Sequence, residues 1–545
     1  MVKFYEDRAL QEKHDSTYQT LPKPVRVLPP GLDEAAFDRV LIEFLAIVGK
    51  ENVASGDEVI NFKDPYPLDN EAHQPSAGVC PATLEEVQAI LDVCNRYVVP
   101  VWTCSQGKNF GYGGPAPRVD GSVVLSLHRM NRIIEVNEKH AYIVVEPGVT
   151  FFQMYEYLRE HRSRLWISAP ALGWGSIVGN TLDRGHGYLP SGDRQHFIAS
   201  MEIVLANGEV MRTGQWGLKD GPATHLCSNQ FGPQIHGLFL QSNLGVVTKL
   251  ALHLDIAPQA MISVVVSCPE VSQIEGLIDS YEELYRERIL QGHPSIHNVN
   301  HFATRFSRKY EQQTDAGPLS KTSLEKLAAK FGTGYWRSNF DLYGTKAMVN
   351  LRWERVQEVL SNNIPGCKVE HTFWEGENGG PVDQTKIGTV GAGVPAMFAA
   401  ALADYNLPAD GTGAGAHTDI TLLLPSNGKI VHDWFVRMRK IMEDAGADPF
   451  IGCHVWDRHV LFVQEYVYDK TSASARARGR EIMTAIVDEA KRSGYSTYRS
   501  HLMHMGKSPS FEAIEASIDP RGILSPGKNG IWPSKLSENF GRLKI

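Results

Sequence analysis

A glycine-rich loop constrains this chain more than any other stretch of its sequence. It follows an apolar run that ends at Trp102, and it places Gly107, Gly111, Gly113 and Gly114 within eight residues. Because glycine has no Cβ, successive backbone N–H groups can turn toward one point and bind an anion, most often a phosphate. The loop lacks the Gly-Lys-Ser/Thr of a Walker A sequence. We interpret it as a phosphate-binding loop of another fold, with an ordinary glycine-rich turn as the alternative.

Length and composition indicate a large globular protein. A chain of 545 residues predicts two to four domains. Its 42% hydrophobic and 21% charged residues are typical of a globular chain. A net charge of −8 argues against a nucleic-acid-binding protein, because binding to nucleic-acid phosphates needs clustered cations. The seven cysteines are scattered singly, which favours free thiols over a disulfide framework or a zinc site.

The chain shows no targeting or membrane segment that we can identify. Its first residues, Met1–Asp7, have no apolar signal region, and no uninterrupted apolar run is long enough to cross a bilayer. The final Arg-Leu-Lys-Ile is not a peroxisomal Ser-Lys-Leu address. We therefore expect a cytoplasmic protein that does not contact membranes.

Strand and helix patterns alternate along the chain and change in character after Pro258. Thr83 and Glu86 form the pattern of a capping box, and the Asn207-Gly208 turn predicts a hairpin over residues 201–212. The later patterns favour an antiparallel sheet backed by helices. The predicted class is therefore α+β, with four parts: an N-terminal arm at 1–58 over another domain or a partner subunit, a first domain at 59–258, a second domain at 259–495, and a C-terminal segment at 496–545.

Five further patches extend the pattern that begins in the loop. They are Val144–Thr150, Gly175–Asn180, Ser242–Lys249, Tyr498–His501 and Asp519–Lys528. Together with the loop they resemble the vanillyl-alcohol oxidase and p-cresol methylhydroxylase family, FAD enzymes that act on para-substituted phenols. The resemblance implies an FAD-binding domain of the p-cresol methylhydroxylase type, an antiparallel-sheet cap over the substrate, and a C-terminal segment that returns to the FAD domain.

The same resemblance implies which residues contact FAD. The pyrophosphate would lie on backbone amides of the loop, the isoalloxazine beside the run from Gly175 to Asn180, and the adenine near the main chain of Val247. The implied cofactor-binding residues are Ser105, Gly107, Lys108, Asn109, Gly111, Gly175, Ser176, Asn180, Val247, His417, Arg499 and Lys528. Each of these positions is also compatible with ordinary turn structure.

His417 is the candidate for a covalent bond to the flavin. The run Gly411–His417 resembles the Gly-Ala-His at which family members attach the 8α-methyl of FAD. The alternative is a loop histidine that contacts the flavin without a bond. The same run fits a loose dinucleotide pattern, but a strand-like run follows it, so we do not predict NAD binding. The pair His501 and His504 lacks a third ligand at a suitable spacing, so we expect no metal.

Tyr112, Tyr498 and Arg499 match the family residues that clamp the phenolic oxygen of the substrate. A guanidinium and two donating hydroxyl groups stabilise a phenolate and lower the pKa of the phenol. A hydride can then leave the para-side-chain Cα toward flavin N5, which gives a quinone methide. Without the resemblance, a packed tyrosine and a salt-bridged surface arginine would be the simpler interpretations.

The sequence departs from the family beside the expected flavin N5. The oxidases carry an acidic residue where this chain has Ala171, and some relatives are also acidic at the place of Ser168. Trp174 replaces a glycine of the relatives and would narrow the substrate pocket. We expect the chemistry to survive with an altered preference. Asp193 or Asp419 would supply an acid from another direction, although either is otherwise a surface or capping carboxylate.

We therefore expect FAD-dependent oxidation of a para-substituted phenol of the 4-alkyl, 4-allyl or 4-hydroxybenzyl-alcohol type. Oxygen would reoxidise the flavin and give H2O2, and the chain would form a homodimer or a larger homo-oligomer. Three alternatives stay open: a dehydrogenase of the same fold that docks a cytochrome subunit, an enzyme that oxidises a 2-hydroxy acid, and a flavin-binding protein without turnover.

Overall fold

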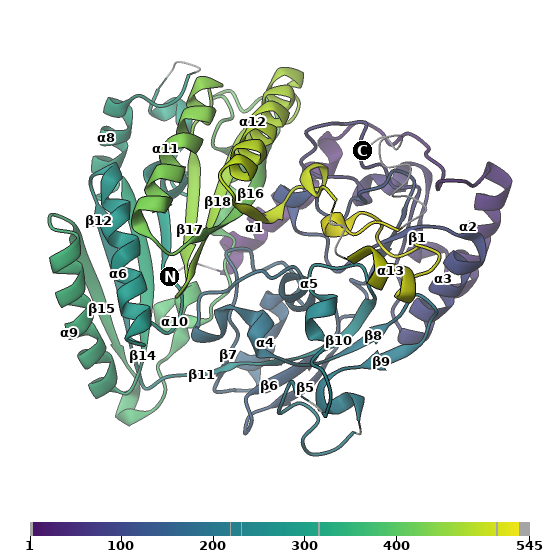
Figure 1. Ribbon diagram of the computed structural model, residues 1–545, viewed down its shortest axis with the longest axis horizontal. Helices are drawn as coiled ribbons and strands as arrows, with labels where there is room; N and C mark the ends of the chain where they lie inside the picture. The colour runs from purple at the N-terminus through teal and green to yellow at the C-terminus, as the bar shows by residue number, and fades with distance from the viewer. Residues whose placement is uncertain (1–3, 219, 230, 314–316, 508–510, 534–545) are drawn as a thin grey trace. The chain divides into compact units, whose positions relative to one another are not determined.

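A computed structural model describes residues 4–218, 220–229, 231–313, 317–507 and 511–533. The chain forms two compact units (Figure 1). The loop unit, named for its glycine-rich loop, comprises Asp15–Gly187, Asp193–Asp255 and Leu502–Ile545. The sheet unit comprises Met1–His14, Tyr188–Gly192 and Ile256–His501. The mixture of helices and sheets confirms the predicted α+β class.

The loop unit contains most of the residues that the sequence assigned to an N-terminal arm. Helix α2 (Glu34–Val48) buries Phe37, Val40 and Phe44 in the same core as α3 (Leu84–Tyr97). Asp33 caps α2 by accepting a hydrogen bond from the Ala36 amide. Helix α2 is thus part of the core of this unit.

The first sheet of the loop unit places the glycine-rich loop at the end of a strand. Its order is β1-β2-β4-β3, with β2 and β3 parallel to β4 and β1 antiparallel to β2. The strands are β1 (Val53–Ala54), β2 (Ala77–Val79), β3 (Val101–Cys104) and β4 (Val123–Ser126). Helix α3 begins at the predicted cap, where Thr83 Oγ1 accepts from the Glu86 amide at 3.1 Å. The Glu86 carboxylate accepts from Ala82 instead of Thr83, so only half of the predicted capping box forms.

The second sheet is antiparallel, in the order β5-β6-β10-β8-β9. Its strands are β5 (Ile133–Asn137), β6 (Tyr142–Val145), β8 (Ile198–Val204), β9 (Val210–Arg212) and β10 (Val246–His253). Strands β8 and β9 confirm the predicted hairpin, and its turn uses Gly208 at φ +83°. The helices α4 (Phe151–Glu160), α5 (Ile177–Leu182) and α13 (Glu512–Ile518) also belong to the loop unit.

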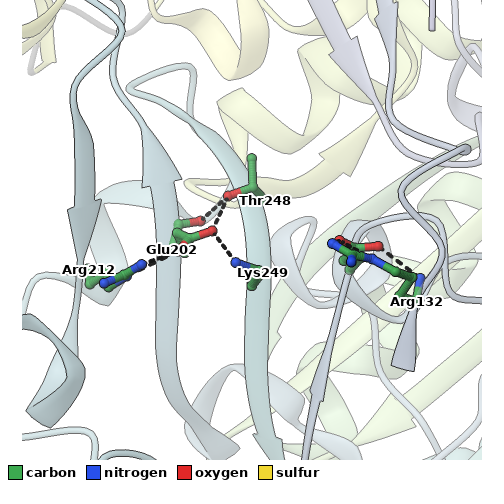
Figure 2. A network of polar contacts seen from close by, with 6 residues as sticks. Arg132, Glu202, Arg212, Thr248 and Lys249 are labelled. Atoms are coloured by element: carbon green, nitrogen blue, oxygen red, sulfur yellow. Dashed lines mark hydrogen bonds and ion pairs between the residues drawn. The ribbon is translucent and has the colours of Figure 1, made fainter. Parts of the chain in front are cut away.

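Buried charges in this second sheet are paired (Figure 2). The fully buried Glu202 carboxylate accepts from Lys249 Nζ at 2.8 Å, from Arg212 at 2.9 Å and from Thr248 Oγ1 at 3.1 Å. Burial alone would raise the pKa of Glu202, but the hydrogen bonds from Lys249 and Arg212 hold it below its usual value. These contacts join β8, β9 and β10, so the ion cluster fixes the alignment of three strands.

The C-terminal segment contributes backbone contacts to the first sheet. The Val101 amide donates to the Ile523 carbonyl at 2.7 Å, and the Ser525 amide donates to the Val101 carbonyl at 2.6 Å. Asn243 Nδ2 donates to the Leu524 carbonyl at 3.0 Å. Segments near residues 101, 243 and 523 thus meet beside β3, where the glycine-rich loop begins.

The sheet unit is organised around one antiparallel sheet in the order β15-β12-β14-β13-β17-β18-β16-β19. This sheet confirms the predicted antiparallel cap. The strands are β12 (Ala260–Cys268), β13 (Ser295–Asn298), β14 (Trp336–Gly344), β15 (Lys368–Glu375), β16 (Gly415–Pro425), β17 (Phe450–Val455), β18 (His459–Asp469) and β19 (Ser496–Ser500).

Helices cover one face of this sheet (Figure 1). They are α6 (Ile274–Arg286), α9 (Lys346–Asn363), α11 (Gly428–Asp444) and α12 (Ala473–Arg492). Shorter helices of the chain are α1 (Phe4–Asp15), α7 (Val299–Ala303), α8 (Lys321–Lys330) and α10 (Gln384–Ile387), and two short strands are β7 (Leu165–Trp166) and β11 (Asp255–Ile256). No helix within the described residues combines the length and apolar composition that a membrane span requires.

Strand alternation gives the sheet two different faces. Gln464 faces α11, because Trp434 Nε1 donates to its Oε1 at 3.3 Å, and Ser338 faces α6, because Tyr281 donates to its Oγ at 2.7 Å. Successive strand residues point to opposite faces. The neighbouring strand residues, which we call the polar face, therefore lie on the side away from these helices: His297, Arg337, His417, Asp419, Thr421, His454 and Glu465.

Candidate functional site

The glycine-rich loop of the loop unit presents a run of unbonded backbone donors. None of the amides from Ser105 to Asn109 donates to another residue within the described part of the chain. Gly107 turns the loop at φ +64°, and a Cβ there would lie 2.9 Å from Pro115. Adjacent N–H groups with no internal acceptor form a concave anion site. The loop therefore fits the pyrophosphate of a dinucleotide.

A second glycine segment packs directly against this loop within the same unit. Ser176 caps α5 by accepting from the Gly179 amide at 2.9 Å, and it donates to the Pro147 carbonyl at 2.5 Å. A Cβ on Gly179 would lie 2.2 Å from Ser105 Oγ, so only glycine permits this approach. The structure thus brings together the two segments to which the resemblance assigned the pyrophosphate and the isoalloxazine.

Arg194 fixes the end of this segment and was missed in the sequence. Its guanidinium is 1% exposed, donates to Asn180 Oδ1 and to the Ser168 carbonyl, and lies 5.1 Å from the centre of the Phe151 ring. These contacts orient the side-chain amide of Asn180, one of the predicted cofactor contacts. An isolated arginine carries no motif, so no sequence signal was available to find it.

Aromatic rings surround Phe110 at the base of the loop. The ring centre of Trp174 lies 5.1 Å from that of Phe110, and Trp174 is 5% exposed. Tyr18 and Tyr66 contact Phe110 edge-on, with ring centres 5.9 and 5.3 Å from that of Phe110. Lys108 forms an ion pair with Asp15, which leaves its backbone amide as its predicted link to a cofactor phosphate.

The remaining predicted contacts of this unit lie near β3 or in the second sheet. Lys528 Nζ lies 5.7 Å from the centre of the Trp102 ring and 3.9 Å from Asp183. Val247 is a buried residue of β10, opposite Ile203. Ala171 is half-buried three residues before Trp174. The contacts of Lys528 and Val247 with FAD stay predictions, as does the place of Ala171 in the substrate pocket.

On the polar face of the sheet unit, an ion pair and a neutral pair lie next to each other. His417 Nδ1 donates to Asp419 Oδ1 at 2.6 Å, both on β16. Asp419 is the cross-strand partner of Glu465 on β18, and Glu465 Oε2 lies 3.1 Å from Nε2 of His301 in α7. The sequence had offered Asp419 as a replacement acid; it had missed Glu465 and His301.

The protonation states of these four residues differ. Burial lowers the pKa of His417, but hydrogen-bonded Asp419 outweighs burial and raises it above its usual value. Burial, with Asp419 nearby, raises the pKa of Glu465 well above its usual value, and burial lowers that of His301 to about 3. At neutral pH, Glu465 is therefore a carboxylic acid beside a neutral imidazole, whereas the hydrogen bond to Asp419 favours the protonated form of His417.

Three ligand atoms in this cluster, from His417, Asp419 and Glu465, lie within 4.8 Å of one another. The Nδ1 atom of His417 already donates to Asp419, and Glu465 is protonated at neutral pH, so two of the three donors are unsuited to a cation. The expectation that the protein binds no metal stays a prediction.

Strand β19 contains a bulge at the predicted clamp. Arg499 pairs with Thr421 of β16, whereas Thr497 pairs with Leu422, so Tyr498 is the extra residue. A bulge interrupts strict alternation and re-aims side chains, which allows two consecutive residues to serve one site. Thr421 follows Asp419 on the polar face, so Arg499 lies in the strand next to the His417–Asp419 pair. Tyr112 belongs to the other unit, at the end of a 3-10 helix (Phe110–Tyr112), and the three-residue clamp stays a prediction.

Comparison with known proteins supports the interpretation of both units. Residues 75–214 match the FAD binding domain model. The flavoprotein subunit of 4-cresol dehydrogenase [hydroxylating] from Pseudomonas putida is 30% identical over 520 residues, which cover 93% of this chain and 98% of that protein. The chain belongs to the vanillyl-alcohol oxidase and p-cresol methylhydroxylase family. Like its relatives, this family member is an FAD-dependent oxidoreductase.

Solved structures of the family agree over nearly the whole chain. The 4-ethylphenol oxidase from Gulosibacter chungangensis, in its isoeugenol complex, has a TM-score of 0.87 and 31% identity, and the match covers 94% of this chain and 100% of that one. Substrate-bound p-cresol methylhydroxylase has a TM-score of 0.86 and 29% identity, over 93% and 99% of the two chains. The similarity therefore includes both the loop unit and the sheet unit.

Proposed function

We propose that this enzyme oxidises para-substituted phenols at the side-chain carbon attached to the ring. The observation that carries the proposal is the position of Arg499 and the bulged Tyr498 in β19, beside the His417–Asp419 pair of β16. The similarity to 4-cresol dehydrogenase and to 4-ethylphenol oxidase supports the same substrate class. In this proposal Tyr112, Tyr498 and Arg499 bind the ring oxygen as a phenolate.

Each group of the proposed site then has a definite task. Arg499 and the two tyrosines stabilise the phenolate, which pushes electron density through the ring toward the para side chain. When bound, FAD supplies the acceptor for the hydride. Glu465 carries a proton beside His301 Nε2, and this neutral pair can give or take a proton as water adds to the quinone methide. It would replace the acid that is missing at Ala171.

We also propose that His417 holds FAD covalently. Asp419 accepts from Nδ1, which assigns the bond to Nε2 and holds the imidazole in one orientation. Denaturation with trichloroacetic acid tests this proposal, because covalent flavin stays yellow in the pellet and fluoresces on a denaturing gel. The His417→Ala variant should release its flavin to the supernatant. A colourless wild-type pellet from yellow protein would refute the covalent bond.

The electron acceptor has two candidates. We propose O2, which gives H2O2. The similarity to a flavoprotein subunit of a dehydrogenase favours the second candidate, a cytochrome partner. Mixing reduced enzyme with air-saturated buffer separates them. Full reoxidation within the turnover time supports an oxidase, and reoxidation slower than turnover with an artificial dye supports the dehydrogenase.

The phenol specificity is tested with a panel of 4-ethylphenol, 4-cresol and 4-hydroxybenzyl alcohol, together with a 2-hydroxy acid. We expect the phenols to reduce the flavin and the hydroxy acid not to do so. Reduction by the hydroxy acid alone would overturn the proposal. Lack of reduction by every phenol would overturn it as well.

A further inference from the structure

The polar face continues away from β16 to a second group of cations. Thr421 is in register with Val463 of β18, Gly452 of β17 and His297 of β13. His297 is in turn in register with Arg337 of β14. A single row of one sheet face thus joins the strand next to β19 to Arg337. Gly452 has no side chain in the middle of this row.

Arg305, just after α7, stands beside Arg337. The Arg337 guanidinium lies 4.7 Å from the centre of the Phe302 ring, and the Arg305 guanidinium lies 4.0 Å from that of Phe398. Both arginines have a buried Nε atom with no hydrogen-bond partner. Within the part of the chain that the structure describes, neither guanidinium forms a hydrogen bond or an ion pair. The two arginines thus lie against phenylalanine rings with no anionic side chain among the described residues bound to either guanidinium.

The groups around the two arginines supply no compensating charge. Burial, together with the nearby Arg337, lowers the pKa of Arg305 to about 10. Burial also lowers the pKa values of His297 and His301, so both rings are neutral. Tyr188, which burial keeps protonated with a pKa of about 12, faces Arg305 as well.

Three carboxyl groups lie within electrostatic range of these residues. Asp419 acts on His301, but it is hydrogen-bonded to His417 and not to either arginine. Glu465 acts on Tyr188, but it is itself protonated at neutral pH. The exposed Glu370 raises the pKa of Arg337, although burial outweighs it and it forms no ion pair with that arginine among the described residues. A partly buried pair of cations without a counter-charge costs free energy unless a ligand neutralises it.

We propose that Arg305 and Arg337 bind a carboxylate at the end of the substrate's para side chain. A guanidinium matches a carboxylate with two parallel hydrogen bonds, and Phe302 and Phe398 offer apolar surface to the carbon chain that leads to it. The position agrees with a continuous site, because Arg305 acts electrostatically on His301, which contacts Glu465, the neighbour of Asp419. This substrate class rests on the proposed function of the same polar face.

A series of 4-hydroxyphenyl-alkanoic acids of increasing chain length, each paired with its methyl ester, tests the carboxylate site. At the fitting length, kcat/KM for the acid should exceed that for the ester by roughly 10-fold or more, the range of a charge-assisted contact. The Arg305→Met and Arg337→Met variants should each remove this preference and keep activity on the esters. Arg458→Met is the matched control, because Arg458 belongs to the same unit and its side chain is 89% exposed.

The outcomes separate this proposal from the proposed function. If the esters are oxidised as well as the acids at every chain length, the carboxylate site is refuted and phenol oxidation stands. If no phenol reduces the flavin, phenol oxidation is refuted, and equilibrium dialysis of the acids still decides the carboxylate site. Binding to wild-type protein that falls at least 10-fold in Arg305→Met and is unchanged in Arg458→Met supports it. Equal binding to all three proteins overturns it.

Discussion

Two clusters of buried charge, one in each unit, are handled differently. In the second sheet of the loop unit, Glu202 is surrounded by Lys249, Arg212 and Thr248, and all of its contacts are internal (Figure 2). On the polar face of the sheet unit, Arg305 and Arg337 have aromatic neighbours and no anion among the described residues. Internal pairing serves the fold, whereas an unpaired buried charge is kept at a cost to stability. We infer from this difference that the Glu202 cluster is structural and that the pair Arg305 and Arg337 serves a ligand.

The largest effect should come from the clamp on the polar face. Arg499→Met removes the fixed cation that stabilises the phenolate, so kcat/KM for 4-ethylphenol should fall roughly 100-fold. Tyr498→Phe removes one hydroxyl and should cost about 10-fold. Steady-state assays compare both variants with Arg458→Met. A loss below twofold in either clamp variant would show that the residue does not bind the ring oxygen.

Breaking the paired cluster should affect stability instead of activity. Glu202→Gln leaves Lys249 and Arg212 without their carboxylate and should lower the free energy of unfolding by about 1–3 kcal/mol. Both cations keep some solvent contact, which limits the effect. Urea unfolding followed by circular dichroism measures it, and flavin content and phenol turnover should not change. An unchanged unfolding midpoint would contradict the structural role.

A buried acid in the C-terminal segment should give the loop unit a pH-dependent stability. Burial, together with Asp519 and Glu512, raises the pKa of Glu515 from 4.5 to about 7. The folded state holds this proton more tightly than the unfolded state, so its contribution is complete below pH 4.5 and is lost as the pH rises to about 7. Glu515→Gln should therefore flatten the fall in Tm over that range. A parallel pH profile for both proteins would be inconsistent with this assignment.

The smallest expected change is in the Tm of Arg305→Met, and it tests the comparison of the two charge clusters most sharply. Arg305→Met replaces an unpaired cation by an apolar side chain of similar length, so Tm should stay the same or rise slightly. Arg212→Met, which removes a partner of Glu202, should lower Tm in the same assay. If Arg305→Met were the more destabilising of the two, Arg305 would have a structural partner and the contrast between the two clusters would fail.

The loop unit could be predicted from local sequence because its site is made of backbone. Gly107 and Gly179 are required by close approaches to Pro115 and Ser105, and such requirements leave glycines in the sequence. The hairpin at Asn207-Gly208 is equally local. The helix pattern of Leu32–Gly49 is visible in the sequence, but it was assigned to an arm because the sequence does not show that its apolar stripe packs into the core of the loop unit.

The polar face was harder to predict because it depends on strand register. His417 was found through a motif. Glu465, in contrast, lies beside Asp419 only because β16 pairs with β18, and His301 contacts Glu465 only because α7 lies against the same face. A single acid inside the apolar run from Val460 to Tyr468 was the available signal for Glu465. No comparable signal marks Arg305 and Arg337, whose proximity follows from tertiary packing alone.

Anaerobic mixing with a 4-alkylphenol tests most directly the claim that the polar face binds a phenol for oxidation. The oxidised-flavin absorbance of the wild-type enzyme should bleach within the turnover time and without added electron carriers. The rate should be roughly 100-fold lower in Arg499→Met and unchanged in Arg458→Met. A wild-type flavin that stays oxidised in the presence of saturating phenol would contradict the account.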